Sequence, residues 1–291
     1  MSEQVGPHRG AAPAALLLLV PLLVALALVP AASAPIADAP ALPAGARGLW
    51  PGESVTVRGT RSVVIGRPAP ITSSAEPASS VSLVELARLA DTAALRVGAV
   101  LGKPVRPLVI VPASAAEAAR LAGTGPIDGL AALADGDRVL VVPEVFARLN
   151  PTGRDVVLAH ELTHVAAGTD RLPVWLYEGF ADYVGYRDSG LPVRTAAAEL
   201  ADEVRAGRLP GELPGPAAFA ADGSDPARLA RAYQESWLAC RFLADRFGEE
   251  TLVRLYREAQ VAGADRALAG LGLSTATLTD QWRAYVREQL A

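Results

Sequence analysis

Two histidines and a glutamate in one short stretch carry the clearest potential for chemistry in this chain. Residues 154–164 read R-D-V-V-L-A-H-E-L-T-H, with His160 and His164 four residues apart and Glu161 next to the first. On an α-helix this spacing places both imidazoles on one face. Paired imidazoles beside a carboxylate are typical of a zinc site in which the carboxylate acts on an activated water. Since the chain holds only three histidines, this register is informative, and we predict a metal site here.

A catalytic zinc needs a third protein ligand, and two acids compete for that role. Glu178 lies fourteen residues after His164 on what reads as the next helix, and Asp182 follows one helical turn later, so both acids face the same way. Glu178 would then bind the metal, while Asp182 would hold a ligand imidazole in one tautomer. Asp170, six residues after His164 in a loop, is the alternative ligand. We favour Glu178.

Start and stop signals frame the two helices that must position these groups. Asn150 is a capping residue and Pro151 suits the first turn, so the histidine helix should begin there and end at Gly168. Pro173 then opens a second helix, V-W-L-Y-E-G-F-A-D-Y-V. Trp175 on that helix is expected to pack against the histidine helix.

Apolar periodicity predicts the remaining elements, which together indicate an α+β fold with a small N-terminal mixed sheet followed by a mainly helical part. The expected strands are 54–57, 62–65, 108–111, 129–134 and 138–142. The expected further helices are 81–100, 113–122, 193–206, 226–247, 249–260, 264–271 and 277–290. The strand at 138–142 is expected to offer a free edge to which an extended peptide could pair.

The N-terminus carries the signals of export. Arg9 precedes an apolar run over 11–34 that ends in A-S-A, the small-x-small form of a signal-peptidase site, although Pro35 should hinder cleavage. Residues 1–34 are therefore either a signal peptide or an uncleaved membrane anchor, since the run is long enough to span a bilayer. Residues 35–80 read as a Pro/Ala/Ser-rich linker that contains a short β-hairpin separate from the main domain at 81–291.

Composition excludes several classes of protein. The 291 residues are 51% hydrophobic, enough for a sizeable core, and the net charge of −4 with no long run of one sign argues against nucleic-acid binding. Cys240 is the only cysteine, so an intramolecular disulfide and a cysteine-based zinc cage are both impossible. After residue 34 no segment is long and apolar enough to cross a membrane, which excludes an intramembrane protease.

H-E-L-T-H followed by L-P-V-W-L-Y-E-G-F-A-D-Y-V resembles the gluzincin zinc metallopeptidases, in particular peptidase MA-like domains with a W-L-x-E-G-x-A-x-Y segment. The resemblance extends over roughly residues 81–290, and its specific part is the central thirty residues. It implies a zincin-like fold in which Glu178 completes the zinc site and Asp182 supports it. Asp170 matches the metzincin offset instead, but the glycine stands at 168 rather than 167, and Met1 is the only methionine, so no methionine turn can form.

The resemblance also implies a mechanism with one zinc ion as cofactor. Such a site activates a water near neutral pH, and Glu161 would take its proton as general base and return it to the leaving amine. By similarity to a tyrosine in the late helix of related domains, Tyr233 is the candidate second donor to the oxyanion. Tyr233 also falls at core spacing with Leu229, Trp237, Cys240 and Leu243, so a core role is the alternative. Tyr177 and Tyr183 are weaker candidates.

These features predict an exported zinc metallopeptidase of gluzincin type. Two alternatives stay open: an inactive extracytoplasmic binding domain that keeps the fold, and a zinc amidase acting on a cell-wall amide. The expected partner is a peptide or protein substrate, with no nucleic acid and with membrane contact only through the N-terminal segment. We expect a monomer.

Overall fold

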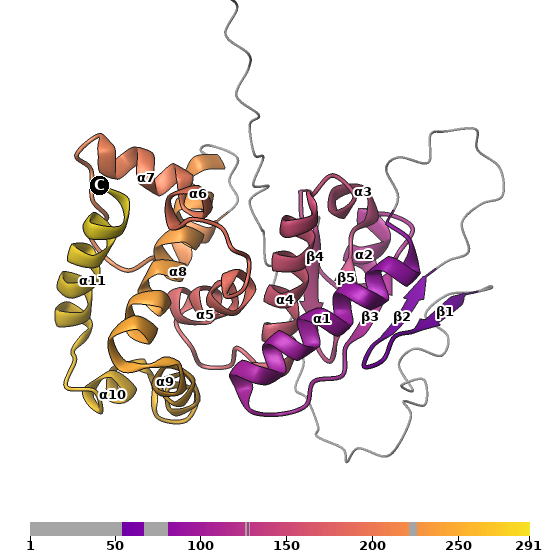
Figure 1. Cartoon of the computed structure of the whole chain (residues 1–291), viewed down its shortest axis with the longest axis horizontal. Helices are drawn as coiled ribbons and strands as arrows, with labels where there is room; N and C mark the ends of the chain where they lie inside the picture. The colour runs from indigo at the N-terminus through magenta and orange to yellow at the C-terminus, as the bar shows by residue number, and fades with distance from the viewer. Residues whose placement is uncertain (1–53, 67–80, 126, 128, 221–225) are drawn as a thin grey trace, which may run out of the picture.

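The computed structural model describes residues 54–66, 81–125, 127, 129–220 and 226–291. The expected leader and most of the expected linker lie outside these ranges. Within them, a small mixed sheet with its covering helices precedes a group of helices, which confirms the α+β class (Figure 1). No helix in the described ranges has the length and apolar character that crossing a membrane requires.

Five short strands form one sheet at the beginning of the described chain. They are β1 (Val55–Arg58), β2 (Val63–Gly66), β3 (Leu108–Val111), β4 (Ala132–Asp135) and β5 (Arg138–Val141). Their spatial order is β1-β2-β3-β5-β4, with parallel pairs in the middle and an antiparallel pair at each end. The three inner strands are largely buried and apolar, as expected of parallel strands that are covered on both faces.

The strand at the end of the sheet next to the histidine helix is β4. The prediction of a free edge at 138–142 is wrong, because β5 lies between β3 and β4 and is paired on both sides. The turn after β4 contains Gly136 with a φ of 60°, which folds β5 back along β4. The apolar residues 139–141 of β5 are then buried inside the sheet, while β4 is left at the end.

The β1–β2 hairpin belongs to this sheet. The sequence prediction set it apart from the main domain, whereas β2 pairs in parallel with β3. The side chain of Asp91, on the helix that follows, accepts hydrogen bonds from the backbone N–H groups of Thr60, Arg61 and Ser62 at 2.6, 2.8 and 2.9 Å. One carboxylate therefore fixes the hairpin turn against the helix.

Four helices accompany the sheet: α1 (Leu83–Leu101), α2 (Ala115–Ala122), the single turn α3 (Pro143–Phe146) and α4 (Pro151–Ala167). Ser82 and Ser114 cap α1 and α2 at their N-termini, and a left-handed glycine ends each helix. The sequence predicted α1, α2 and α4 and missed only α3, which is too short to show a period.

The remaining helices form the second half of the molecule (Figure 1). They are α5 (Val174–Tyr186), α6 (Val193–Ala196), α7 (Ala198–Arg205), a 3-10 turn η3 (Pro216–Phe219), α8 (Pro226–Phe247), α9 (Glu249–Ala262), α10 (Ala264–Ala269) and α11 (Thr275–Leu290). The single helix expected over 193–206 is interrupted at Ala197, whose backbone is not helical. The side chain of Gln234 on α8 accepts a hydrogen bond from the N–H of Leu200 at 2.9 Å. A backbone N–H in the first turn of α7, which has no partner within that helix, is thus paired by α8.

Glycines let α5 pack closely against two neighbours. A Cβ at Gly179 would lie 2.1 Å from the carbonyl oxygen of Ser236 on α8, and one at Gly185 would lie 3.1 Å from that of Val156 on α4. A Cβ at Gly179 would overlap the backbone of α8, and one at Gly185 would press against that of α4, so these glycines let α5 lie directly between the histidine helix and α8.

Candidate metal centre

The helix α4 presents both histidines to the interior. Asn150 accepts a hydrogen bond from the N–H of Gly153 at 2.7 Å and Pro151 opens the first turn, which confirms the predicted start of the helix. His160, Glu161 and His164 are all buried. Buried imidazoles and carboxylates are costly unless they are paired or bind a metal, so this helix face needs partners.

The helix α5 supplies acids to the same place. Glu178 and Asp182 lie one turn apart and are both buried. Glu178 Oε2 lies 3.2 Å from His160 Nε2 and 3.4 Å from His164 Nε2. The two histidine Nε2 atoms are themselves 3.0 Å apart. The structure thus brings together the three side chains that the sequence favoured as ligands, in a cluster that is compatible with a metal site.

The distances within this cluster fit a zinc ion. Zn–N and Zn–O bonds of about 2.0–2.1 Å in a tetrahedron place neighbouring ligand atoms about 3.3 Å apart. The three observed separations of 3.0, 3.2 and 3.4 Å surround that value. Glu178 Oε2 makes no hydrogen bond although it is buried. A buried, unsatisfied carboxylate oxygen and two imidazole nitrogens that converge in this way are suited to a cation.

Asp182 fixes one of the imidazoles. Its Oδ1 lies 2.7 Å from Nδ1 of His160, so Nδ1 carries a proton and the other ring nitrogen, Nε2, faces the cluster. Burial lowers the pKa of His160, but the carboxylates of Asp182, Glu178 and Glu161 together more than offset this and raise that pKa well above its usual value, so a cation at Nε2 would take the place of a proton. The predicted supporting place of Asp182 agrees with this geometry.

Glu161 lies beside the cluster without joining it. Its Oε2 accepts a hydrogen bond of 2.8 Å from the backbone N–H of Ala134 on the edge strand β4, while its Oε1 has no hydrogen-bond partner. Burial raises the pKa of Glu161 to about 7, although the nearby imidazoles oppose the rise. A carboxylate with one oxygen held and the other free, and with a pKa near neutrality, is suited to general-base work.

Two of the three candidate tyrosines have rings close to a histidine of the cluster, and the third bonds to another helix. The ring of Tyr233 is buried and its centroid lies 6.3 Å from that of His160, while Tyr177 lies 5.9 Å from His164. The hydroxyl of Tyr183 donates to Glu249 at 2.8 Å, so Tyr183 is engaged in an interaction with α9. Tyr233 is therefore both part of the buried helix face and next to the site.

Asp170 is exposed and does not belong to the His/His/Glu cluster. It follows Gly168, which ends α4 as predicted with a φ of 73°.

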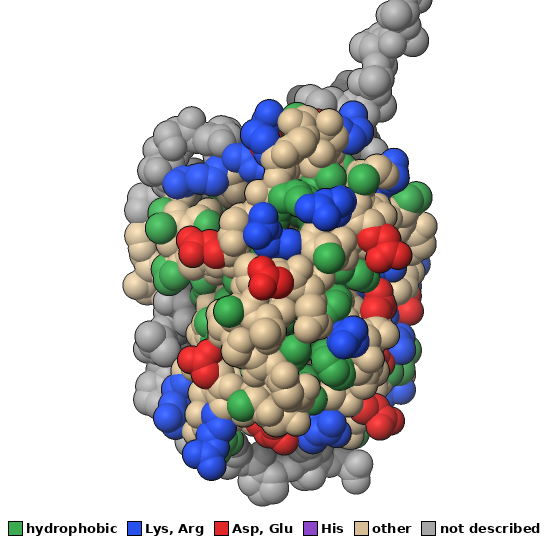
Figure 2. Space-filling view, turned by 90° about the vertical axis from the view of Figure 1, so that its left-hand side faces the viewer, with side chains coloured by type: hydrophobic (Ala, Val, Ile, Leu, Met, Phe, Trp, Pro, Cys, Tyr) green, Lys and Arg blue, Asp and Glu red, His purple; other side chains and the backbone are tan. Residues whose placement is uncertain are grey.

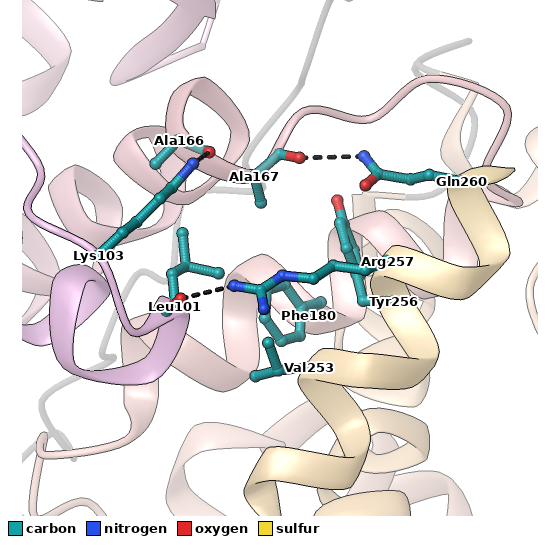
Figure 3. A pocket seen from close by; sticks show the side chains of 9 residues that line it. All are labelled: Leu101, Lys103, Ala166, Ala167, Phe180, Val253, Tyr256, Arg257 and Gln260. Carbon is teal, nitrogen blue, oxygen red and sulfur yellow. Dashed lines mark hydrogen bonds between the residues drawn. The ribbon is translucent and has the colours of Figure 1, made fainter.

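Side chains from two other segments hold the C-terminal end of α4 (Figure 3). Lys103 and Gln260 donate hydrogen bonds to the carbonyl oxygens of residues 166 and 167, at 2.7 and 3.0 Å. Tyr256 donates one to the carbonyl oxygen of residue 168 at 2.5 Å. These carbonyl groups are at the end of the helix, where no N–H group of the helix itself is available to them. The positive charge of the lysine also interacts favourably with the helix dipole. The helix turn that carries His164 is thereby fixed from outside.

A buried cation connects α4 and α5 to α1. Arg96 lies 2.6 Å from Asp155 on α4, donates to the carbonyl oxygen of Gly185 on α5 at 3.1 Å, and lies 3.4 Å from Asp188. The sequence analysis did not single out Arg96. The available signal was an arginine within the otherwise apolar face of α1. The role of the Ala134 N–H had no signal, because it is a backbone group.

Comparison with known proteins places the chain far from characterised sequences. No protein-family model matches it, and no curated protein is significantly similar to it. Among solved structures it is similar to the crystal structure of an M1 zinc metallopeptidase from Deinococcus radiodurans, with 18% sequence identity and a TM-score of 0.44. The match covers 82% of this chain and 51% of that one, so the chain spans about half the length of that metallopeptidase. A similarity at this level assigns no function, and the candidate site rests on its own geometry.

Proposed function

We propose that the chain is a zinc-dependent metallopeptidase of gluzincin type, with His160, His164 and Glu178 as ligands and Glu161 as general base. The observation that supports this most strongly is the convergence of the three ligand atoms within 3.4 Å of one another, beside a buried carboxylate that stays outside the cluster. A domain that only bound metal or a partner would have no use for Glu161 in that position.

A zinc ion in this site would supply Lewis-acid polarisation of the substrate carbonyl and would activate the attacking water. Glu161 takes the proton of that water at Oε1, since the Ala134 N–H holds Oε2. The same carboxyl group then delivers the proton to the nitrogen of the leaving amine. Asp182 keeps His160 in the ligand tautomer, and Tyr233 donates to the oxyanion that develops at the carbonyl.

A peptide is the substrate that suits the surroundings of Glu161. Among the described strands β4 is at the end of the sheet, and the residue that holds Glu161 lies on it. An extended peptide paired along this edge would place a backbone carbonyl next to the general base. On the face of the molecule on the α11 side, basic and acidic side chains are interspersed with apolar ones (Figure 2), unlike the clustered basic surface of nucleic-acid-binding proteins.

Export remains part of the proposal. It rests on Arg9, the apolar run over 11–34 and the A-S-A tripeptide. Under this reading the substrate is extracytoplasmic.

Hydrolysis by the zinc-loaded full chain tests the proposal. Native protein and Glu161→Gln are incubated with a mixture of unmodified peptides and, separately, with muropeptides. Glu161→Gln should retain zinc and lose roughly 100- to 10,000-fold in turnover of peptides. Tyr233→Phe should lower the turnover number and leave the fold intact.

Cleavage of muropeptides without cleavage of peptides would contradict the peptidase proposal and favour a cell-wall amidase. Equal rates for native protein and Glu161→Gln on every substrate would favour a non-catalytic binding domain. Unchanged turnover in Tyr233→Phe would show that this tyrosine only packs in the core and does not donate to the oxyanion.

A further inference from the structure

A cavity of about 560 Å³ lies between the start of α5, the segment around η3 and the start of α11. Its volume falls within the range of roughly 300–1,000 Å³ that is typical of ligand sites. Trp175, Tyr177, Leu213 and Phe219 are among the side chains that line it. None of the groups assigned to the metal centre belongs to this lining.

Two of the lining side chains connect the cavity with the metal centre. The ring of Tyr177 lies 5.9 Å from that of His164. The ring of Phe219 lies 5.0 Å from that of Tyr233, which in turn lies 6.3 Å from His160. The rings of Tyr177 and Phe219 therefore lie on the side of the cavity that is nearest the metal centre. A substrate side chain next to a carbonyl at the metal centre could extend along these rings into the cavity.

The lining favours an apolar occupant. The aromatic and aliphatic side chains provide most of the wall, and the polar groups of α11 are already used: Thr275 donates to Asp265 at 2.7 Å, and Thr279 donates to the carbonyl oxygen of Thr275 at 2.8 Å. Glu212 is the one charged side chain among the described lining residues, and it is exposed. Its carboxylate would repel an acidic substrate side chain.

We infer that this cavity is the subsite that selects the substrate: it receives a bulky apolar side chain, aromatic or long aliphatic, that flanks the peptide bond to be cleaved. The inference rests on the proposed peptidase function and deepens it. Tyr177 and Phe219 line the part of this subsite that is nearest the metal centre.

Two glycines allow a matched test. Gly215 lines the cavity and Gly211 does not, and a Cβ added at either would meet no atom within 4 Å. Gly215 has a φ of −91°, which any residue adopts. Gly215→Trp should therefore fill the cavity without straining the backbone, and Gly211→Trp is the control for a new surface tryptophan.

The probes are alanine-based hexapeptides that carry Phe, Leu, Ala or Glu at one position at a time, with cleavage positions read by mass spectrometry on the full chain. Native protein should cleave at bonds flanked on one fixed side by Phe or Leu about 10- to 100-fold faster than at the same bonds flanked by Ala, and slowest with Glu. Gly215→Trp should reduce the Phe-to-Ala ratio at least about tenfold and leave the Ala peptide unchanged. Gly211→Trp should behave as the native protein does. A Phe-to-Ala ratio that Gly215→Trp leaves unaltered would overturn the inference.

Binding separates this inference from the proposed function. The dissociation constant of the Phe hexapeptide is measured by calorimetry on Glu161→Gln, alone and combined with Gly215→Trp or Gly211→Trp. Weaker binding in the Gly215→Trp combination alone supports the subsite even if no peptide is hydrolysed, in which case only the peptidase proposal fails. Equal binding in all three proteins rejects the subsite.

Discussion

Asp182 acts on the metal centre through a single contact, its 2.7 Å hydrogen bond with Nδ1 of His160. Asp182→Asn removes the charge from that contact while it keeps the size of the side chain, so the imidazole is less firmly oriented and less basic. We predict a zinc dissociation constant about 10- to 100-fold weaker, measured by competition with a chelator. Asp202→Asn, an exposed acid on α7, is the control. Native affinity in Asp182→Asn would show that Asp182 does not support the site.

Gly179, which is next to Glu178, lies directly against the backbone of α8. Gly179→Ala would place a methyl group 2.1 Å from the carbonyl oxygen of Ser236, and backbone must move to admit it. We predict a loss of about 1–3 kcal/mol in the free energy of unfolding, measured by urea denaturation. Gly211→Ala, which meets open space, should cost far less. Equal stability in Gly179→Ala and Gly211→Ala would contradict the close approach of α5 to α8 at Gly179.

At this scale the sequence singled out side chains that the structure brings together. His160, Glu161 and His164 are recognisable because their spacing is local to one helix, and Glu178 because its helix follows directly. The backbone N–H of Ala134 is part of the same site and could not be found, because every residue has one. Whether Tyr233 faces the core or the site depends on where α8 crosses α5, which periodicity does not determine.

The relative position of the helices depends on Arg96, which extends from α1 to both ligand-bearing helices. Arg96→Met leaves Asp155, whose side chain is only 20% exposed, without its cation. We predict a loss of about 2–4 kcal/mol in the free energy of unfolding. Arg88→Met on the exposed side of α1 is the matched control and should be nearly neutral. If Arg96→Met leaves the free energy of unfolding unchanged, packing alone fixes α1 against α4 and α5.

The β1–β2 hairpin makes stability depend on pH through Asp91. Burial raises the pKa of Asp91, but hydrogen bonds from the backbone N–H groups of Arg61, Thr60 and Ser62 outweigh it and leave the pKa below its usual value. Because the folded pKa is lowered, this contribution to stability is fully present above the unfolded pKa of about 4 and is lost as the pH falls through the folded pKa.

The stability advantage of native protein over Asp91→Asn should therefore be constant from pH 7 to about pH 5 and should shrink below about pH 4. Urea denaturation of both proteins at each pH measures it. An advantage that persists unchanged at low pH would contradict the assigned role of the carboxylate.

Elements with local signals were predicted and those that depend on distant partners were not. The caps at Asn150, Ser82 and Ser114 lie within the segments that they start, so the starts of α4, α1 and α2 are close to their expected positions. The interruption at Ala197 depends on Gln234 of α8, which is distant in the sequence. The 193–206 helix pattern therefore reads as continuous.

For the whole molecule, the sheet half and the helical half meet at the metal centre. Glu161 is held by β4 of the sheet, while Glu178 and Asp182 come from the first helix of the second half. The α+β class followed from the order of the elements along the chain. The order of the strands did not, because nothing local distinguishes an inner strand from an edge strand, and β5 and β4 were therefore misassigned.

Zinc content of the purified full chain tests the central claim most directly. It is measured by elemental analysis for native protein, Glu178→Ala, Asp170→Ala and Glu161→Gln, prepared in parallel. We predict one zinc per chain in the native protein, in Asp170→Ala and in Glu161→Gln, and its loss in Glu178→Ala, since only Glu178 lies with the two histidines. Zinc retained by Glu178→Ala, lost in Asp170→Ala or absent from the native protein would contradict the account.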